Sequence, residues 1–138
     1  MLSRDEIASL VPHHGDMLLI DSVREWSEEK IVCVSNQHRS ADNPLRRGGI
    51  LPAASGIEFC GQAMAIHGAL VGVAKDRRGL LVALRDVRFA VQRLDLGEGE
   101  LLIEATAIDR SADASSYGFC LSGAGKELLS GRAIVLFA

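Results

Sequence analysis

The chain has 138 residues, of which 48% are hydrophobic and 24% charged, and its formal net charge is −3. This length and composition predict one soluble globular domain over residues 1–138, large enough to enclose a single hydrophobic core. The acidic balance, without a basic tract or stacking aromatic residues, argues against a nucleic-acid binder. The amino terminus lacks the apolar run of a signal peptide, and the apolar stretch 50–74 is interrupted by polar residues and a proline. We therefore expect a cytoplasmic protein without a membrane span.

The cysteine and histidine residues do not indicate a metal centre. Cys33, Cys60 and Cys120 are scattered and form no C-x-x-C pair, which argues against both a disulfide framework and a structural zinc site. Cys60 lacks an obvious activating base, so we expect a buried, inert thiol there. His13 and His14 are adjacent, and adjacent histidines rarely bind one ion together. The sequence therefore predicts no metal site.

The first half of the chain predicts a short helix and a strand hairpin. Ser3 followed by Glu6 matches a capping box, so a helix of one or two turns is expected to begin there. The apolar runs 16–26 and 30–37 flank the polar turn Ser-Glu-Glu and are typical of two paired strands. A long polar loop that holds three arginines follows over 38–49. Loops of this length in a compact domain usually have a function.

A long helix is predicted over 53–71, opened by Pro52. Apolar or small residues occupy every side of it, a pattern that indicates a helix enclosed by the core. Four further strands are expected over 80–91, 99–109, 115–123 and 127–138, and the last three are joined by short turns and therefore antiparallel. This order predicts an α+β fold in which a curved antiparallel sheet wraps around one long central helix.

Glu58 is the residue of this helix that most needs an explanation, because a buried carboxylate is costly unless it is paired, capped or used. Ser55 and Glu58 fit a capping box, in which the glutamate would satisfy the backbone at the start of the helix and have no chemical role. Alternatively, desolvation by the apolar helix would raise the pKa of Glu58 and make it a proton donor. The residue pattern alone leaves both interpretations open.

The segment LPAASGIEFCGQAMA carries the clearest motif. With Pro52, Glu58 and Gln62, it resembles the second half of H-F-P-G-x-P-x-x-P-G-x-x-x-x-E-A-M-A-Q, the signature of the hot-dog-fold β-hydroxyacyl-carrier-protein dehydratases of fatty-acid synthesis. The segments LVPHHGDMLLIDSV and DVRFAVQRLDLGEGELLIEA are also similar to that family. More narrowly, HRSADNPLRRGGILPA resembles a divergent branch of predicted thioester dehydratases associated with aryl-polyene-type clusters. The family histidine matches His38, which precedes Glu58 by twenty residues instead of the family's usual fourteen, and Ala53 replaces a family glycine.

This resemblance implies a hot-dog-fold enzyme that dehydrates 3-hydroxyacyl thioesters to 2-enoyl thioesters, in fatty-acid- or polyene-type synthesis, without a cofactor. His38 would take the α-proton and Glu58 would protonate the departing hydroxide, each with a pKa near the working pH. The resemblance assigns stabilisation of the thioester oxygen to the N–H of Ala53, at the amino end of the helix. Gln62 either orients Glu58 or is a polar packing residue.

The implied partners are an acyl carrier protein, with the substrate on its 4′-phosphopantetheine arm, and a second hot-dog subunit. His38 would act with Glu58 of the second chain, in a homodimer or a heterodimer. The candidate docking residues for the acidic carrier protein are Arg39, Arg46, Arg47, Arg77 and Arg78. Two other functions stay open: a hot-dog thioesterase or enoyl-thioester hydratase, and a catalytically weak subunit that pairs with an active hot-dog partner.

Overall fold

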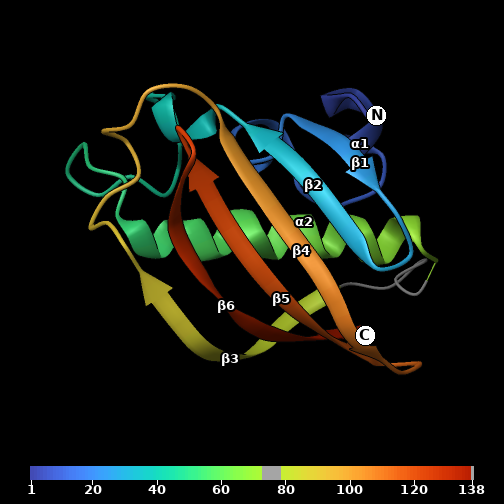
Figure 1. Ribbon diagram of the computed structural model, residues 1–138. Helices are drawn as coiled ribbons and strands as arrows, with labels where there is room; N and C mark the ends of the chain where they lie inside the picture. Colours follow the sequence, from blue (N-terminus) through green and yellow to red (C-terminus); the bar gives the residue numbers. More distant parts are fainter. Residues whose placement is uncertain (73–78, 138) are drawn as a thin grey trace.

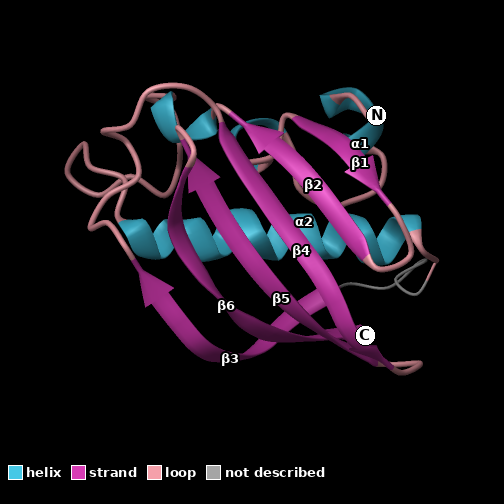
Figure 2. Ribbon diagram, in the orientation of Figure 1, coloured by secondary structure: helices cyan, strands magenta, loops and turns pink. Residues whose placement is uncertain are grey.

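The computed structural model of the chain describes residues 1–72 and 79–137. Its six strands form one antiparallel sheet in the order β1-β2-β4-β5-β6-β3, which curves around the long helix α2 (Figures 1 and 2) and confirms the predicted α+β arrangement. The helices and strands are α1 Arg4–Ala8, β1 Ser22–Trp26, β2 Lys30–Ser35, α2 Gly56–Leu70, β3 Gly79–Phe89, β4 Leu101–Arg110, β5 Ala114–Gly123 and β6 Lys126–Phe137. Three 3₁₀ turns are η1 Gly15–Met17, η2 Gln37–Arg39 and η3 Ala53–Ser55. No helix within residues 1–72 and 79–137 is long and apolar enough to cross a membrane.

The amino-terminal elements form as their capping and strand patterns predict, with one difference. The side chain of Ser3 accepts from the N–H of Glu6, whose carboxylate reaches back to the Ser3 backbone, so α1 begins with the predicted capping box. β1 and β2 pair as the predicted antiparallel hairpin. The first strand begins at Ser22 and not at residue 16. The reason is that Gly15–Met17 forms a 3₁₀ turn and the next three residues are buried in the core.

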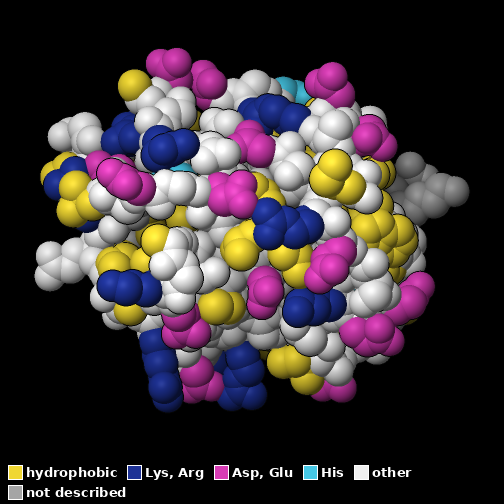
Figure 3. All heavy atoms as spheres, turned by 45° about the horizontal axis from the view of Figure 1, so that its top comes forward, with side chains coloured by type: hydrophobic (Ala, Val, Ile, Leu, Met, Phe, Trp, Pro, Cys, Tyr) yellow, Lys and Arg dark blue, Asp and Glu magenta, His cyan; other side chains and the backbone are white. Residues whose placement is uncertain are grey.

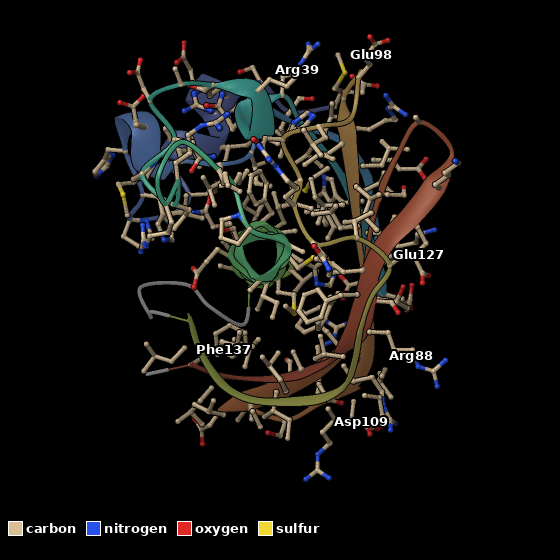
Figure 4. The ribbon with its side chains drawn as sticks, turned by 90° about the vertical axis from the view of Figure 1, so that its left-hand side faces the viewer. Arg39, Arg88, Glu98, Asp109, Glu127 and Phe137 are labelled. Atoms are coloured by element: carbon tan, nitrogen blue, oxygen red, sulfur yellow. The ribbon has the colours of Figure 1, made fainter. Side chains whose placement is uncertain are left out.

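The helix predicted over 53–71 consists of η3 and α2, and it is buried only on the side that faces the sheet. Phe59, Ala63 and Ile66 are fully buried in one cluster with Tyr117 and Phe119, which point inward from β5 as their alternation predicts. The opposite stripe is exposed or half-buried and consists of Ala54, Glu58, Ala65 and Ala69. Figure 4 views α2 end-on and shows the sheet along two of its sides. The prediction of a helix enclosed on every side is therefore wrong for one chain by itself, because the sheet ends at β3 beside this stripe.

The two edges of the sheet differ. The β1 edge is short and is covered by the amino terminus, where Leu2 and Val23 exchange backbone hydrogen bonds of 2.9 and 3.0 Å. β3 is long, and no described segment pairs with its outer edge. The exposed apolar residues of β3 are Leu80, Leu81, Val82, Leu84 and Phe89. An open edge strand with an apolar surface is typical of a strand that meets another chain.

Candidate active site

His38 is held in the 3₁₀ turn η2, directly after β2. Its side chain is buried, with 1% of its surface exposed, and within the described residues its Nδ1 atom has no hydrogen-bond partner. Asp21 fixes the start of the turn, since its carboxylate accepts from the Asn36 N–H at 2.6 Å and from Gln37 Nε2 at 2.8 Å. Most buried polar atoms are hydrogen-bonded, so a buried imidazole with an unpartnered nitrogen is a candidate for chemistry.

The surroundings of His38 keep its ring neutral. Burial lowers the pKa of His38 below its ordinary value, because the imidazolium ion would lose hydration. The positive charges of Arg39 and Arg46 lower this pKa further, whereas the Gly99 backbone and the charge of Asp21 oppose the lowering. The ring is therefore neutral at neutral pH, which is the protonation state that a general base requires.

The buried neutral histidines predict a pH-dependent stability. His67 bonds through its ring nitrogens to Tyr117 Oη and the Ser27 carbonyl, both at 2.8 Å, and burial lowers its pKa as it does that of His38. In the unfolded chain both histidines titrate near pH ~6.5. Below that pH the unfolded state binds more protons, so the free energy of unfolding falls by up to ~1.4 kcal/mol per pH unit for each histidine, until the folded pKa is reached.

Urea denaturation between about pH 8 and about pH 5 measures this dependence. The variant His67→Gln replaces one titrating group by a neutral amide and is expected to reduce the slope below pH ~6.5. A slope that is the same in His67→Gln and in the wild type would contradict the assignment.

A cavity of about 500 Å³ lies beside His38. Its apolar walls come from the connection between β3 and β4, from the start of β4 and from the β5–β6 hairpin, through Val91, Leu94, Leu96, Leu101 and Leu128. Glu98 is also in the lining, and Figure 4 shows it at the same end of the molecule as Arg39, the neighbour of His38. An apolar cavity with few polar groups suits a hydrocarbon-like part of a ligand. Sequence reasoning missed this wall because it treated 91–98 as a strand end and a turn; the spaced apolar residues there were the available signal.

Glu58 lies on the exposed side of the first turn of α2, against the expectation of a buried carboxylate. The capping interpretation fails, because Ser55 has helical backbone angles of φ −61° and ψ −24°, makes no side-chain capping bond, and donates its N–H to the Pro52 carbonyl at 3.0 Å. Glu58 instead lines a pocket of about 260 Å³ together with Ala65 and Leu80. In one chain by itself, Glu58 is therefore exposed to solvent and not desolvated as we expected.

His38 and Glu58 are not brought together within one chain. His38 lines the 500 Å³ cavity, whereas Glu58 lines the pocket beside β3, and none of the described residues lines both. This separation agrees with the expectation that His38 acts with Glu58 of a second chain, which stays a prediction.

Two other expected site groups are engaged in holding the fold. The N–H of Ala53 donates to the Gln92 carbonyl at 2.9 Å, so it is not available to a thioester oxygen in this structure, which corrects that expectation. Gln62 is buried, and its amide accepts from the Leu19 N–H and donates to the Met17 carbonyl, both at 2.8 Å. Gln62 therefore fixes the segment before β1 instead of orienting Glu58, and it is the polar packing residue of the two interpretations.

Gln62→Leu is expected to lower the free energy of unfolding by about 2 kcal/mol, because the Leu19 N–H and the Met17 carbonyl lose their side-chain partner. Urea denaturation measures the loss. Gln92→Leu is the matched control, since its side chain is exposed, and its effect is expected to stay within about 0.5 kcal/mol. A Gln62→Leu chain as stable as the wild type would show that the two bonds contribute nothing.

The candidate docking arginines fall into three groups. Arg46 is largely buried and bonds to the backbone of its own loop, so it is not free to dock. Arg39 and Arg47 are exposed. Arg77 and Arg78 lie outside the described residues. Figure 3 shows basic and acidic side chains interspersed over the face that it views, so no single basic patch covers that face.

The described residues offer neither a reactive thiol among the buried cysteines nor a group of side chains that could bind a metal ion. Cys60 is buried as expected, and burial raises the pKa of its thiol, as it raises that of Cys33 to about 12. A thiol with a raised pKa is a poor nucleophile. Among residues 1–72 and 79–137, no three His, Cys, Asp or Glu side chains are grouped in a way that would hold a metal ion.

Comparison with protein-family models identifies the family of this chain. Residues 5–137 match the ApeP-like family, described as ApeP dehydratase. The chain belongs to the ApeP-like dehydratase family. This match confirms the resemblance to a divergent dehydratase branch. No curated protein matches the sequence.

Solved structures confirm that this ApeP-like chain has the predicted hot-dog fold. The dehydratase heterocomplex ApeI:P from Xenorhabdus doucetiae matches with a TM-score of 0.82 at 23% identity, over 96% of this chain and 90% of that chain. AziG of S. sahachiroi matches with a TM-score of 0.61 at 14% identity, over 83% and 88% of the two chains. A thioesterase from Haemophilus influenzae matches with a TM-score of 0.62 at 10% identity, over 85% and 77%. At these identities the likeness shows the fold alone.

Proposed function

We propose that the chain dehydrates 3-hydroxyacyl thioesters, carried by acyl carrier protein, to 2-enoyl thioesters in fatty-acid- or polyene-type synthesis. The observation that carries the proposal is His38, a buried neutral imidazole with an unpartnered nitrogen beside an apolar cavity of about 500 Å³. Membership of a dehydratase family supports the reaction type. The apolar cavity supports an acyl group as the part of the substrate that lies next to the base.

In the proposed reaction, His38 accepts a proton from the α-carbon, and the electron pair of that C–H bond forms the new double bond. Glu58 of a second subunit donates a proton to the β-hydroxyl group, which leaves as water when its C–O bond breaks. His38 then loses its proton and Glu58 regains one, so the site returns to its starting state without a cofactor. Contact with a second subunit desolvates Glu58 and favours the protonated carboxyl that this step needs.

A second hot-dog subunit completes the proposed site. Glu58 shares its pocket with Leu80 and Leu81 of the open β3 edge, so one partner would cover both the edge and the carboxylate. The partner is either another copy of this chain or a different hot-dog chain. The dehydratase heterocomplex ApeI:P, whose fold this chain shares, supports the second arrangement.

The test is an assay of the purified chain, alone and mixed with a hot-dog partner from the same source, on a 3-hydroxyacyl carrier protein. Mass spectrometry of the carrier-bound acyl group detects the loss of one water. Enoyl product from the chain alone supports a homomeric dehydratase, and product only after mixing supports a subunit that depends on its partner. Free acid without enoyl product would replace the proposal by a thioesterase. An unchanged substrate in both assays would contradict it.

A further inference from the structure

Arg46 connects three parts of the chain around His38. Its Nε donates to the Ser40 carbonyl at 2.8 Å, and its Nη2 donates to the His38 carbonyl at 3.1 Å. Its Nη1 donates to the Gly49 carbonyl at 2.9 Å and lies 3.5 Å from Asp95 Oδ2. Only 17% of the Arg46 side chain is exposed. A guanidinium group has five N–H donors in one rigid plane, so these contacts use most of its capacity and fix the bonded segments relative to one another.

The carboxylate at the far end of this connection is itself fixed. Asp95 lies between Leu94 and Leu96, which line the cavity, and only 8% of its side chain is exposed. Arg93 donates to both of its oxygens, from Nε at 2.9 Å and from Nη2 at 2.6 Å. These hydrogen bonds hold the pKa of Asp95 well below its ordinary range, so the carboxylate stays charged. Arg46 therefore links the turn η2 to the wall of the cavity.

The link to the His38 carbonyl matters because no side-chain hydrogen bond on Nδ1 orients the imidazole. Asp21 holds the residues before His38, through the Asn36 N–H and the Gln37 side chain. Arg46 holds the carbonyl of His38 itself. The direction in which the ring points therefore depends on its contact with the Gly99 backbone and on a His38 backbone that is restrained from both sides, and Arg46 supplies the restraint on the carbonyl side.

We infer that Arg46 is a positioning residue, which keeps His38 beside the cavity by tying the His38 carbonyl to the cavity wall. This inference rests on the proposed function, in which His38 is the base. It replaces the expectation that Arg46 docks the carrier protein, because a guanidinium bonded to three carbonyls is not free to bind an acidic surface. Arg47 is exposed, and within the described residues its side chain bonds only the nearby Pro44 and Arg46 carbonyls. Arg39 and Arg47 therefore stay candidates for docking, together with Arg77 and Arg78.

The experiment compares Arg46→Ala and Arg46→Lys with two other variants in the assembly that the wild type forms. Arg24→Ala is the matched control, because Arg24 also makes an ion pair, at 2.8 Å to Glu100, but is half exposed on β1. Arg47→Ala reports docking. Rates are measured with a carrier-bound 3-hydroxyacyl substrate and with a carrier-free 3-hydroxyacyl thioester. Side-chain NMR of labelled histidine follows the His38 ring through a pH titration, with His38→Asn to assign its signal.

Arg46→Ala is expected to lower kcat about 100-fold on both substrates, with little change in KM. The reason is that even a small displacement of the His38 ring misaligns it with the α-proton of the bound substrate. The His38 signal and the matching limb of the pH–rate profile are expected to move to higher pH, as water and the missing cation change the surroundings of the ring. Arg46→Lys keeps the charge but not the planar set of donors, so it is expected to recover only part of kcat and provides a milder variant if Arg46→Ala does not fold. Arg24→Ala is expected to match the wild type.

Two results would overturn the inference. The first is a defect of Arg46→Ala and Arg46→Lys that is confined to KM for the carrier-bound substrate and equals that of Arg47→Ala, which would return Arg46 to docking. The second is a His38 signal that titrates identically in the wild type and in the folded Arg46 variants. The NMR titration does not depend on turnover, and Arg46→Lys keeps the positive charge. A shifted His38 signal in that variant therefore reports repositioning, even if the wild type forms no enoyl product and the proposed function itself fails.

Discussion

His38→Asn is expected to lower kcat/KM for dehydration by about 1,000-fold in an assembly of identical chains, because a side-chain amide cannot accept the α-proton. Asparagine is smaller than histidine and still polar, so we expect the turn η2 and the cavity to persist. The wild-type rate is expected to rise with pH as His38 deprotonates. The residual rate of the variant is expected to lack this rise in its pH–rate profile. The measurement is the initial rate of enoyl formation across the pH range.

His14→Asn is the matched control for His38→Asn, since His14 is exposed and its side chain makes no capping bond. It is expected to react at the wild-type rate. If the partner is a different hot-dog chain, only one of two sites contains His38, and the variant keeps about half of the rate. A His38→Asn assembly that is as fast as the wild type, with the same pH profile, would mean that the base is another group.

The double variant Val82→Lys/Leu84→Lys is expected to prevent assembly, and activity with it. Both side chains are about half exposed on the open β3 edge, so covering the exposed part of each with a partner contributes about 1 kcal/mol. An ammonium group in the same place must be desolvated without a partner, which costs several further kcal/mol. Because ~1.4 kcal/mol corresponds to a tenfold change in affinity, the dissociation constant is expected to rise at least about 100-fold.

Analytical ultracentrifugation over a concentration series measures this change, and the dehydration rate of the same samples shows whether activity follows assembly. Ile108→Lys is the matched control, because Ile108 is a large exposed apolar residue on β4, away from both sheet edges. It is expected to assemble and react like the wild type. Unchanged assembly and rate in the β3 variant would show that the partner does not use this edge.

The helices and strands could be predicted because the signals that specify them are local. In β5, Tyr117 and Phe119 alternate with small or polar residues, and the alternation alone indicates which side chains point into the core. The turns between the last three strands are short and rich in glycine or acids, so the antiparallel order followed from their lengths. The capping box of α1 lies within four consecutive residues, Ser3 to Glu6.

The candidate site could be predicted only in part, because its contacts join residues far apart in the chain. Gln62 bonds residues that precede it by 43 and 45 positions, which no motif around it indicates. The bond from Ala53 to Gln92 and the buried position of Arg46 depend in the same way on how the loops pack. The exposure of Glu58 could not be predicted for a different reason. A helix that is covered on all sides by its own sheet and a helix that is covered partly by another subunit have the same pattern of apolar residues, so the pattern does not distinguish them.

The double variant His38→Asn/Glu58→Gln tests the central claim most directly, in whichever assembly the wild type forms. If each site takes one group from each subunit, this chain contributes His38 to one site and Glu58 to the other, so the double variant removes a group from both. The account predicts that the wild type converts a 3-hydroxyacyl carrier protein to its enoyl product. For the double variant, it predicts a rate at least about 1,000-fold lower, with unchanged assembly and unfolding temperature. Conversion by the double variant at the wild-type rate would contradict the account.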